Sequence, residues 1–199
     1  MIKYTKITYE ELNMKSFAKK YIKNLIRVLK KVDSNVIEDI ITLLESTKGR
    51  VYILGNGGSS ATASHMVNDL GVGLKRRKIK KFDVISLSDN APVCSAIAND
   101  TGYENIFYLQ LKDILRPDDL IIALSCSGNS KNILKAVKYA RKKKVKVIGI
   151  TGFDGGKLQR LSDVNFHVAT DKGEYGLVED VHMILDHIIY SYYIDAANE

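Results

Sequence analysis

The sequence predicts an α/β protein built on a doubly wound parallel sheet that helices cover on both faces. Two observations support this prediction. From Val51 onward, short runs rich in Val, Ile and Leu alternate with helical patterns, as expected for strands that are buried on both faces. In addition, two serine-rich turns each follow such a run and lead into a helical pattern, which is the strand–turn–helix order of a βαβ unit. Before Val51 the pattern is helical, so the sheet is expected to carry an N-terminal helical extension.

The N-terminal extension, residues 1–48, is expected to hold helices and no strand. Its first apolar positions lie in a lysine-rich background and include Leu25, Val28 and Leu29. Asp33 and Ser34 indicate a break and an N-cap, after which a second helix begins. Because this segment is too small to bury its own apolar face, we expect it to mediate oligomerisation. Residues 49–199 then form the main domain, and the two parts make one structural unit.

Five strands are expected in the remaining chain, at residues 51–54, 83–87, 119–124, 145–151 and 164–168. The helices between them are expected to begin near Ser59, Asn90, Asn129 and Gly156. A long last helix is expected at about 175–196, and its apolar side includes Val178, Val181, Ile184, Leu185, Ile188 and Ile189. Open sheets of this kind bind ligands at the carboxyl ends of their strands, and both serine-rich turns fall there.

The two serine-rich turns are residues 55–60, with the sequence GNGGSS, and residues 125–130, with the sequence SCSGNS. Glycine permits a tight turn, and backbone N–H groups at a helix start suit a phosphate group, as do serine hydroxyls. An ordinary strand–helix loop with a serine cap is a sufficient explanation for one such turn. Its repetition favours a phosphorylated ligand.

The composition is typical of one soluble globular domain, with 199 residues of which 45% are hydrophobic and 27% charged. No apolar stretch approaches the ~20 residues that a membrane span needs, so no membrane partner is expected. The N-terminus lacks the apolar core and cleavage site of a secretion signal. Cys94 and Cys126 are too few for a disulfide framework, so we expect a protein of the reducing cytoplasm.

The net charge of +7 suggests nucleic acid as one possible partner. The basic residues, however, gather in two local runs, at residues 75–81 and 138–144, and no recognised nucleic-acid-binding motif is present. Solvated loops that also steer an anionic substrate are the better explanation. A nucleic-acid partner is therefore not expected.

His65 and Asp69 lie four residues apart on the helix expected to begin near Ser59, so both project from one face. This spacing suits two metal ligands, or an acid–base pair held by a mutual hydrogen bond. On their own, the two residues could equally be a capped or solvent-exposed His–Asp pair with no role in a site.

The last helix carries a second group of ionisable residues, namely Glu179, Asp180, His182, Asp186 and His187. At ~100° per residue, Glu179 and His187 are about 80° apart and share a face, whereas the two histidines are about 140° apart. At most one histidine is therefore expected to join Glu179 in a pocket. Burial of such groups needs partners, but a polar outer stripe on an amphipathic helix remains an alternative.

Taken together, these motifs resemble the sedoheptulose 7-phosphate isomerases, the phosphoheptose isomerases of the sugar-isomerase (SIS) domain superfamily. The resemblance extends over essentially the whole chain. It rests on both serine-rich turns, on His65 and Asp69, and on three further segments: Ala98-Asn99-Asp100, Thr151-Gly152-x-x-Gly155-Gly156, and Val178-Glu179-Asp180-Val181-His182 with His187.

The resemblance implies an open five-stranded SIS domain assembled as a homotetramer, with the N-terminal helices between subunits and the active sites at interfaces. It implies substrate-binding roles for Asn56, Gly57, Gly58, Ser59, Asn99, Asp100, Ser125, Cys126, Ser127, Ser130 and Glu179. The implied metal positions are His65, Asp69, Glu179 and His187, with zinc the usual metal. Asp69 and His187 are the expected acid–base pair, although a side chain that holds a metal cannot freely carry a proton. His182 is expected to point elsewhere.

Several positions depart from the family pattern, and they affect the choice of sugar more than the type of chemistry. The family usually has Glu where this chain has Asp69, whose side chain is one methylene shorter. It usually has Gln where this chain has Glu179, which adds a negative charge that favours a divalent cation or raises the pKa of a neighbouring carboxyl. An arginine often found four residues after the acid is Gly73 here, and a threonine common in the second serine-rich turn is Cys126.

We therefore expect an aldose–ketose isomerase that converts sedoheptulose 7-phosphate to D-glycero-D-manno-heptose 7-phosphate through an enediol, for lipopolysaccharide or capsule precursors. A divalent metal would polarise the carbonyl and stabilise the enediolate. The alternatives are an isomerase of a hexose or pentose phosphate, a non-catalytic protein that binds the bacterial replication initiator, and a sugar-phosphate-sensing regulator. Retention of Asp69 and His187 favours chemistry.

Overall fold

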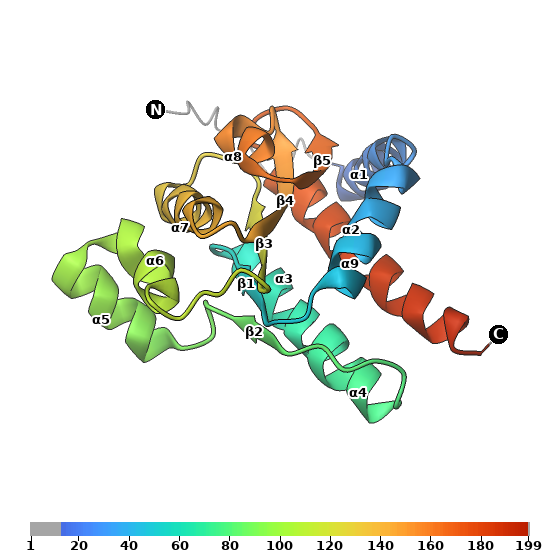
Figure 1. Ribbon diagram of the computed structural model, residues 1–199. Helices are drawn as coiled ribbons and strands as arrows, with labels where there is room; N and C mark the ends of the chain where they lie inside the picture. The colour runs from blue at the N-terminus through green and yellow to red at the C-terminus, as the bar shows by residue number, and fades with distance from the viewer. Residues whose placement is uncertain (1–12, 199) are drawn as a thin grey trace.

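The computed structural model describes residues 13–198 and shows a five-stranded parallel sheet between two layers of helices (Figure 1). The strands are β1 (Val51–Leu54), β2 (Val84–Ser86), β3 (Leu120–Ser125), β4 (Lys146–Phe153) and β5 (Val164–Ala169). Their order in the sheet is β2-β1-β3-β4-β5, and every neighbouring pair is parallel. All five predicted strands and the doubly wound class are confirmed.

The helical segments in chain order are α1 (Met14–Leu29), α2 (Ser34–Ser46), α3 (Gly58–Met66), the π-helix η2 (Val67–Gly73), α4 (Leu74–Arg76), α5 (Ala91–Thr101), the 3₁₀ helix η3 (Tyr103–Asn105), α6 (Ile106–Leu111), α7 (Lys131–Lys142), α8 (Gly156–Leu161) and α9 (Tyr175–Ala196). Buried residues of α2, α3 and α9 share one core with one face of the sheet. Buried residues of α6, α7 and α8 share a second core with the other face. The long last helix has the predicted bounds.

The central strands are apolar along their whole length because both of their faces are covered. All six residues of β3 are buried, with Ile122 in the core beneath α9 and Ile121 in the core beneath α7. This alternation is why the sequence shows a continuous apolar run rather than a polar–apolar repeat.

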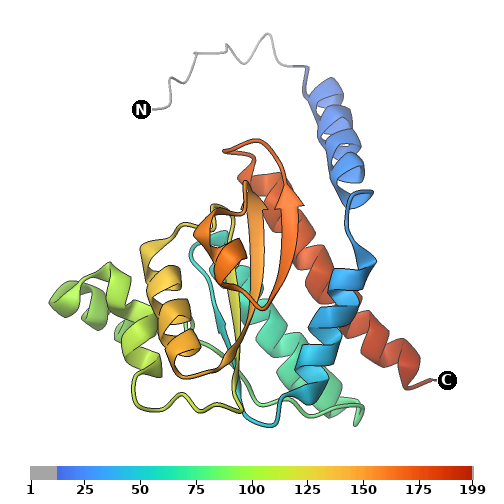
Figure 2. The ribbon, with the colours of Figure 1, turned by 45° about the horizontal axis from the view of Figure 1, so that its top comes forward.

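The two N-terminal helices pack on this unit, and Figure 2 shows α2 beside α9, with α1 extending past the sheet. The predicted break is confirmed, since the Asp33 side chain accepts a hydrogen bond from the Asn35 N–H at 2.9 Å and so caps α2. The Tyr21 hydroxyl of α1 donates to Asp180 Oδ2 of α9 at 2.6 Å. The first residues of the predicted extension, 1–12, lie outside the described part of the chain.

The apolar side chains of α1 divide between a side that packs on the same chain and a side that is exposed. Val28 is buried, and Leu25 and Leu29 pack against the core of their own chain. The large apolar side chains that α1 leaves exposed are Met14, Phe17, Ile22 and Ile26. Leu25, Val28 and Leu29, which are predicted from the sequence to be interface residues, thus pack against the core of their own chain. Their part in subunit contacts stays a prediction.

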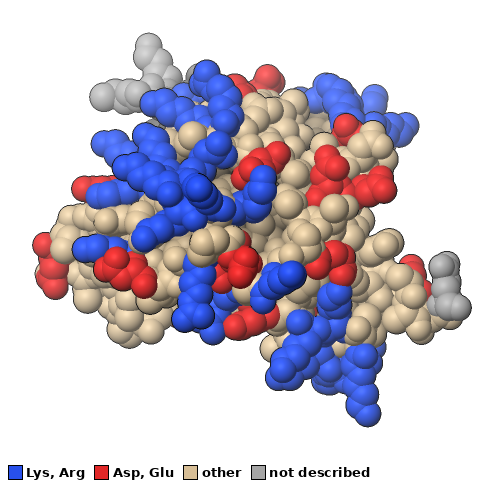
Figure 3. Space-filling model, in the orientation of Figure 1, with Lys and Arg blue, Asp and Glu red and all other residues tan. Residues whose placement is uncertain are grey.

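On the face shown in Figure 3, Lys and Arg side chains gather over α7 and α8, and again near α4. Part of this positive charge is paired locally, because Asp163 forms salt bridges with Lys146 Nζ at 2.9 Å and with Arg141 Nη1 at 3.8 Å. Among residues 13–198, no helix combines the length and apolar character needed to cross a membrane.

Candidate functional site

The two serine-rich turns meet at the point where the strand order reverses. The chain passes from β1 outward to β2 and then returns to β3 on the other side of β1, which leaves a crevice at the carboxyl ends of β1 and β3. Asn56 and Asn132 join its two walls, because each side-chain amide donates to the other's carbonyl oxygen, at 3.0 and 2.8 Å. Tyr103 also donates to Asn56 Oδ1 at 2.9 Å.

A cavity of about 150 Å³ occupies this crevice, and we call it the serine cavity. Its lining comprises Asn56, Ser59, Leu124, Ser125, Cys126, Ser127, Ser130, Tyr175 and Glu179. The Ser125 and Ser130 hydroxyls lie 3.2 Å apart, and Ser127 Oγ accepts from the Asn129 N–H at 3.2 Å. Burial raises the pKa of the Cys126 thiol, so it stays neutral near pH 7 and is a poor nucleophile. The cavity is thus rich in hydroxyl groups beside the start of α7.

Gly57 and Gly58 shape the wall that faces Glu179. Gly57 has φ of 54°, which other residues rarely adopt. A Cβ at position 58 would lie 2.3 Å from the Glu179 carboxylate, so a larger residue there would displace the Glu179 side chain. Desolvation, and then the neighbouring Asp180 charge, raise the pKa of Glu179.

Two of the predicted sugar contacts lie apart from this cavity. Asn99 and Asp100 are exposed on α5, and Asn99 Nδ2 donates to Asp100 Oδ1 at 2.8 Å. Neither residue lines the serine cavity. Tyr175, by contrast, does line it and was not predicted, because as the first residue of α9 it lies outside both serine-rich turns.

A second group of side chains, the histidine–aspartate cluster, joins α3 and η2 to α9. Its members are His65, Asp69, Asp186 and His187, and one ligand atom from each lies within 4.8 Å of all the others. His65 Nε2 lies 3.5 Å from Asp69 Oδ2, 3.2 Å from His187 Nε2 and 4.0 Å from Asp186 Oδ2. The prediction that His65 and Asp69 project from one face is confirmed.

Asp186 replaces Glu179 in this grouping. Glu179 was predicted to join His65, Asp69 and His187, but it lies in the serine cavity and outside the cluster. The angular estimate for α9 neglected the rise of ~1.5 Å per residue, which separates Glu179 from His187 by ~12 Å along the axis. Asp186 is adjacent to His187 in the sequence and fully buried. Burial, and then the charge of Asp69, raise its pKa to about 7.

Asp69 is placed by the π-helix η2, which continues directly from α3. A π turn widens the helix locally and often occurs at functional sites. Asp69 itself is 7% exposed, and Asn68 Nδ2 donates to its Oδ1 at 2.9 Å. Four residues later, a Cβ on Gly73 would lie 2.8 Å from the Tyr190 hydroxyl. The Tyr190 side chain thus lies directly against Gly73.

His182 points away from the cluster, as predicted. Its Nε2 donates to the Thr151 carbonyl oxygen of β4 at 3.3 Å, and the ring is 1% exposed. Burial lowers the pKa of His182 from 6.5 to about 4. The ring is therefore neutral in the folded protein near pH 7 and helps to hold α9 on the sheet.

We predict that His182 makes the protein sensitive to acid. Its folded pKa lies below its unfolded pKa, so the stabilisation is complete above about pH 6.5 and is lost as the pH falls toward 4. A difference of about 2.5 pKa units corresponds to about 3 kcal/mol of unfolding free energy. Urea unfolding measures the unfolding free energy at pH 7 and at pH 4.5. Between these pH values, His182→Gln should lose less unfolding free energy than the unaltered chain, and equal losses would contradict the assignment.

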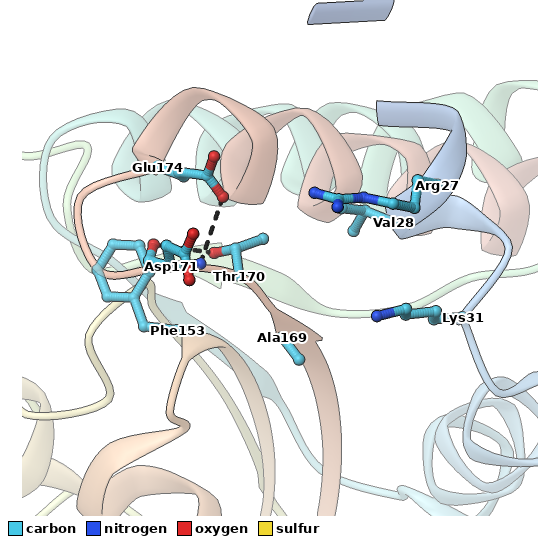
Figure 4. Close-up of a pocket in the computed structure, with 8 residues that line it drawn as sticks. All are labelled: Arg27, Val28, Lys31, Phe153, Ala169, Thr170, Asp171 and Glu174. Atoms are coloured by element: carbon cyan, nitrogen blue, oxygen red, sulfur yellow. Dashed lines mark hydrogen bonds between the residues drawn. The ribbon is translucent and has the colours of Figure 1, made fainter. Parts of the chain in front are cut away.

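A further cavity of about 340 Å³ lies between α1 and the loop from β5 to α9 (Figure 4). Arg27 of α1 and Lys31, just after that helix, face Asp171 and Glu174 of the loop across the cavity. The Asp171 N–H donates to Glu174 Oε2 at 3.3 Å. Its lining includes none of the predicted site residues. The serine cavity and the histidine–aspartate cluster therefore form the candidate site.

Comparison with known proteins agrees with this geometry. Residues 19–152 match the model of the SIS domain family. The chain is 35% identical over 183 residues to the phosphoheptose isomerase of Helicobacter pylori strain P12, which covers 92% of this chain and 91% of that protein. It is 36% identical over 192 residues to the phosphoheptose isomerase of Buchnera aphidicola subsp. Schizaphis graminum, covering 94% and 93%.

Among solved structures, the phosphoheptose isomerase of Neisseria gonorrhoeae matches with a TM-score of 0.82 and 25% identity. The match covers 92% of this chain and 100% of that one. The resemblance drawn from the sequence motifs is thereby confirmed. This chain belongs to the phosphoheptose isomerase family of SIS-domain proteins.

Proposed function

We propose that this chain is a phosphosugar aldose–ketose isomerase that converts sedoheptulose 7-phosphate to D-glycero-D-manno-heptose 7-phosphate, a precursor of surface polysaccharides. The main support is that two helices connect the serine cavity to the histidine–aspartate cluster. On α3, Ser59 and His65 are ~9 Å apart along the axis, and on α9 Glu179 and His187 are ~12 Å apart. A sugar chain with its phosphate at one end and its carbonyl at the other fits that separation.

The serine cavity is the proposed phosphate end. Ser125, Ser127 and Ser130 present hydroxyl groups beside the start of α7, where the helix dipole favours an anion. The net charge of +7 adds long-range attraction for a sugar phosphate. Glu179 lines the same cavity, where its carboxylate is placed to accept hydrogen bonds from sugar hydroxyls.

The histidine–aspartate cluster is the proposed site of proton transfer. Aldose–ketose isomerisation moves a proton between neighbouring carbons and a second proton between the two oxygens. We propose that Asp69 transfers the proton between the two carbons and that His187 transfers the proton between the two oxygens. The His187 ring is exposed and open to an incoming sugar. Buried Asp69 is held close to His65, so it is already oriented when substrate arrives.

The cluster also fits a divalent metal, for which we propose zinc. Imidazole nitrogens and carboxylate oxygens are the ligands that zinc takes, and one such atom from each member of the cluster lies within 4.8 Å of all the others. When bound, the metal polarises the sugar carbonyl. A side chain that holds it cannot also carry a proton, so activity lost on chelation and restored by zinc supports the metal role. Activity that survives chelation supports Asp69 and His187 acting alone.

The decisive experiment is to incubate the purified chain with sedoheptulose 7-phosphate, with and without zinc, and to follow the aldose product by NMR. Fructose 6-phosphate and ribulose 5-phosphate serve as hexose and pentose comparisons. Turnover of the heptose with a kcat/KM at least tenfold above the others is expected. Faster turnover of a shorter sugar would reassign the substrate, and no turnover of any of them would favour a non-catalytic role.

We further propose a homotetramer in which α1 lies between subunits. The support is the row of exposed apolar side chains on α1, which includes Ile22, 56% exposed, and Ile26, 49% exposed. Light scattering at micromolar concentration should give four times the chain mass. The double change Ile22→Lys and Ile26→Lys should yield a smaller species, whereas Lys19→Gln with Lys23→Gln on the same helix should not. A monomer in the unaltered chain would refute the proposal.

We also propose a cytoplasmic location. It is supported by Cys94 and Cys126, which are both free thiols. Cys126 lines the serine cavity, so a reducing compartment would protect the substrate loop from oxidation.

A further inference from the structure

The start of α9 carries two residues of the serine cavity, Tyr175 and Glu179, and is only partly held by its own surroundings. Buried Val178 attaches its apolar side to the core. On its other side, however, no side chain caps the helix at Glu174, and the cavity of about 340 Å³ borders the preceding loop. Tyr175 is 53% exposed. The polar side of this segment therefore depends on contacts with other elements.

Tyr21 of α1 supplies such a contact. Its hydroxyl donates to Asp180 Oδ2 at 2.6 Å in a partly buried setting, and a Cβ on Gly176 would lie 2.9 Å from the same hydroxyl oxygen. Tyr21 thus lies against the first turn of α9 and is bonded to the second. The hydrogen bond to Asp180, and then desolvation, raise the pKa of Tyr21 to about 12, so the hydroxyl remains a donor at physiological pH.

The contact with Asp180 also bears on Glu179, its neighbour in the sequence. Consecutive side chains on a helix point ~100° apart, so a bond that holds Asp180 toward α1 fixes the rotation of α9 that directs Glu179 into the serine cavity. There, Glu179 Oε1 lies 4.0 Å from Cys126 Sγ. Glu179 thus helps to cover Cys126, which is 6% exposed.

We propose that Tyr21 is a positioning residue for substrate binding, because its hydrogen bond to Asp180 holds Glu179 in place at the serine cavity. This inference rests on the proposed function for the identity of the substrate. Neither Tyr21 nor Asp180 lines the cavity, so both act through Glu179. Loss of the Tyr21 hydroxyl should therefore weaken substrate binding more than it slows proton transfer at the histidine–aspartate cluster.

The first test measures the order of the serine cavity without any sugar. Iodoacetamide alkylates accessible thiols, and mass spectrometry of the peptides gives separate rates for Cys126 and Cys94. We expect Tyr21→Phe to speed alkylation of Cys126 by about threefold to tenfold, because a hydrogen bond to a charged group no longer opposes local opening. Cys94 lies on α5, where its thiol donates to the Leu87 carbonyl at 3.4 Å. Its rate should change by less than about twofold.

The matched control is Tyr139→Phe on α7, which also removes a hydrogen-bonded hydroxyl. The Tyr139 hydroxyl accepts from the Asp113 N–H at 3.1 Å, and Tyr139 does not line the serine cavity. This variant should alkylate Cys126 at the rate of the unaltered chain. An acceleration equal to that of Tyr21→Phe would show a general loss of stability and would overturn the inference, as would an unchanged Cys126 rate in Tyr21→Phe or an equal rise at Cys94.

A double-variant comparison tests whether Tyr21 acts through Asp180. Asp180→Ala should speed alkylation of Cys126 as Tyr21→Phe does. Because both changes remove the same hydrogen bond, the double variant should react no faster than the faster single variant, within about twofold. Effects that multiply in the double variant would show that the two residues act independently, and the inference would be wrong.

The second test uses steady-state kinetics with sedoheptulose 7-phosphate. We expect Tyr21→Phe to raise KM by about threefold or more and to leave kcat within about twofold, since Glu179 is placed to bind the sugar rather than to carry the proton. Tyr139→Phe should change neither quantity. A fall in kcat with an unchanged KM would contradict the positioning role, and an unchanged KM would do so even if Cys126 were alkylated faster.

The alkylation rates separate this inference from the proposed activity. If Tyr21→Phe exposes Cys126 but the unaltered chain does not turn over the heptose, the placement of Glu179 by Tyr21 stands and the proposed function fails. If the heptose is turned over but Tyr21→Phe changes neither the Cys126 rate nor KM, the function stands and the inference fails.

Discussion

Replacing His187 with alanine is expected to lower kcat by about 10²–10⁴-fold, the usual contribution of a general acid or base. The His187 ring is placed within 3.2 Å of His65 Nε2 and is exposed at the surface. Its removal therefore withdraws a proton carrier or a metal ligand without opening a cavity in the core. Steady-state kinetics with sedoheptulose 7-phosphate will measure the loss, and circular dichroism should show an unchanged fold.

The matched control for this change is His182→Gln on the same helix. His182 contacts the Thr151 carbonyl rather than the cluster, and glutamine can keep a hydrogen bond to that oxygen. We expect its kcat to fall by less than about tenfold, within the range of effects that act through packing. If His182→Gln were as damaging as His187→Ala, the assignment of the two histidines would be reversed.

Replacing both Ser127 and Ser130 with alanine is expected to raise KM by tenfold or more. A hydrogen bond to a charged group contributes about 1.5–3 kcal/mol, and the two hydroxyls line one small cavity. Because phosphate binding persists in the transition state, kcat/KM should fall at least as far as KM rises. Initial rates over a range of heptose phosphate concentrations will measure both quantities.

Ser46→Ala provides the control for the serine pair. Ser46 is exposed at the end of α2, where its hydroxyl donates to the Leu43 carbonyl at 3.0 Å. Its loss should leave KM unchanged. An unchanged KM in the Ser127 and Ser130 double variant would place the phosphate outside the serine cavity.

Local patterns were sufficient to predict the strands and one half of the cluster. Strands such as β3 are buried on both faces, so each appears in the sequence as an apolar run with sharp ends. The four-residue spacing of His65 and Asp69 is set by the helix itself, and the structure shows the pair 3.5 Å apart. In both cases the decisive geometry lies within one element.

The remaining features depend on contacts between elements. Asp186 and Glu179 are both carboxylates on α9, and only the height at which α9 crosses α3 decides which of them meets His65. One signal was nevertheless available, because a residue at the same height as His187 on α9 must lie within about one turn of it, a condition that Asp186 meets and Glu179 does not. Likewise, the sequence does not show that Val28 is buried in the core of its own chain, because that burial depends on packing between elements.

The reciprocal amide pair between Asn56 and Asn132 has a consequence for the energetics of ligand binding. Because it fastens the loop after β1 to α7 on either side of the crevice, the serine hydroxyls are ordered before any sugar arrives. The conformational entropy of forming this cradle is therefore lost once, during folding, rather than at each encounter with substrate. Affinity for the phosphate end then depends mainly on the contacts made, and a loosened amide pair would weaken binding without removing any of them.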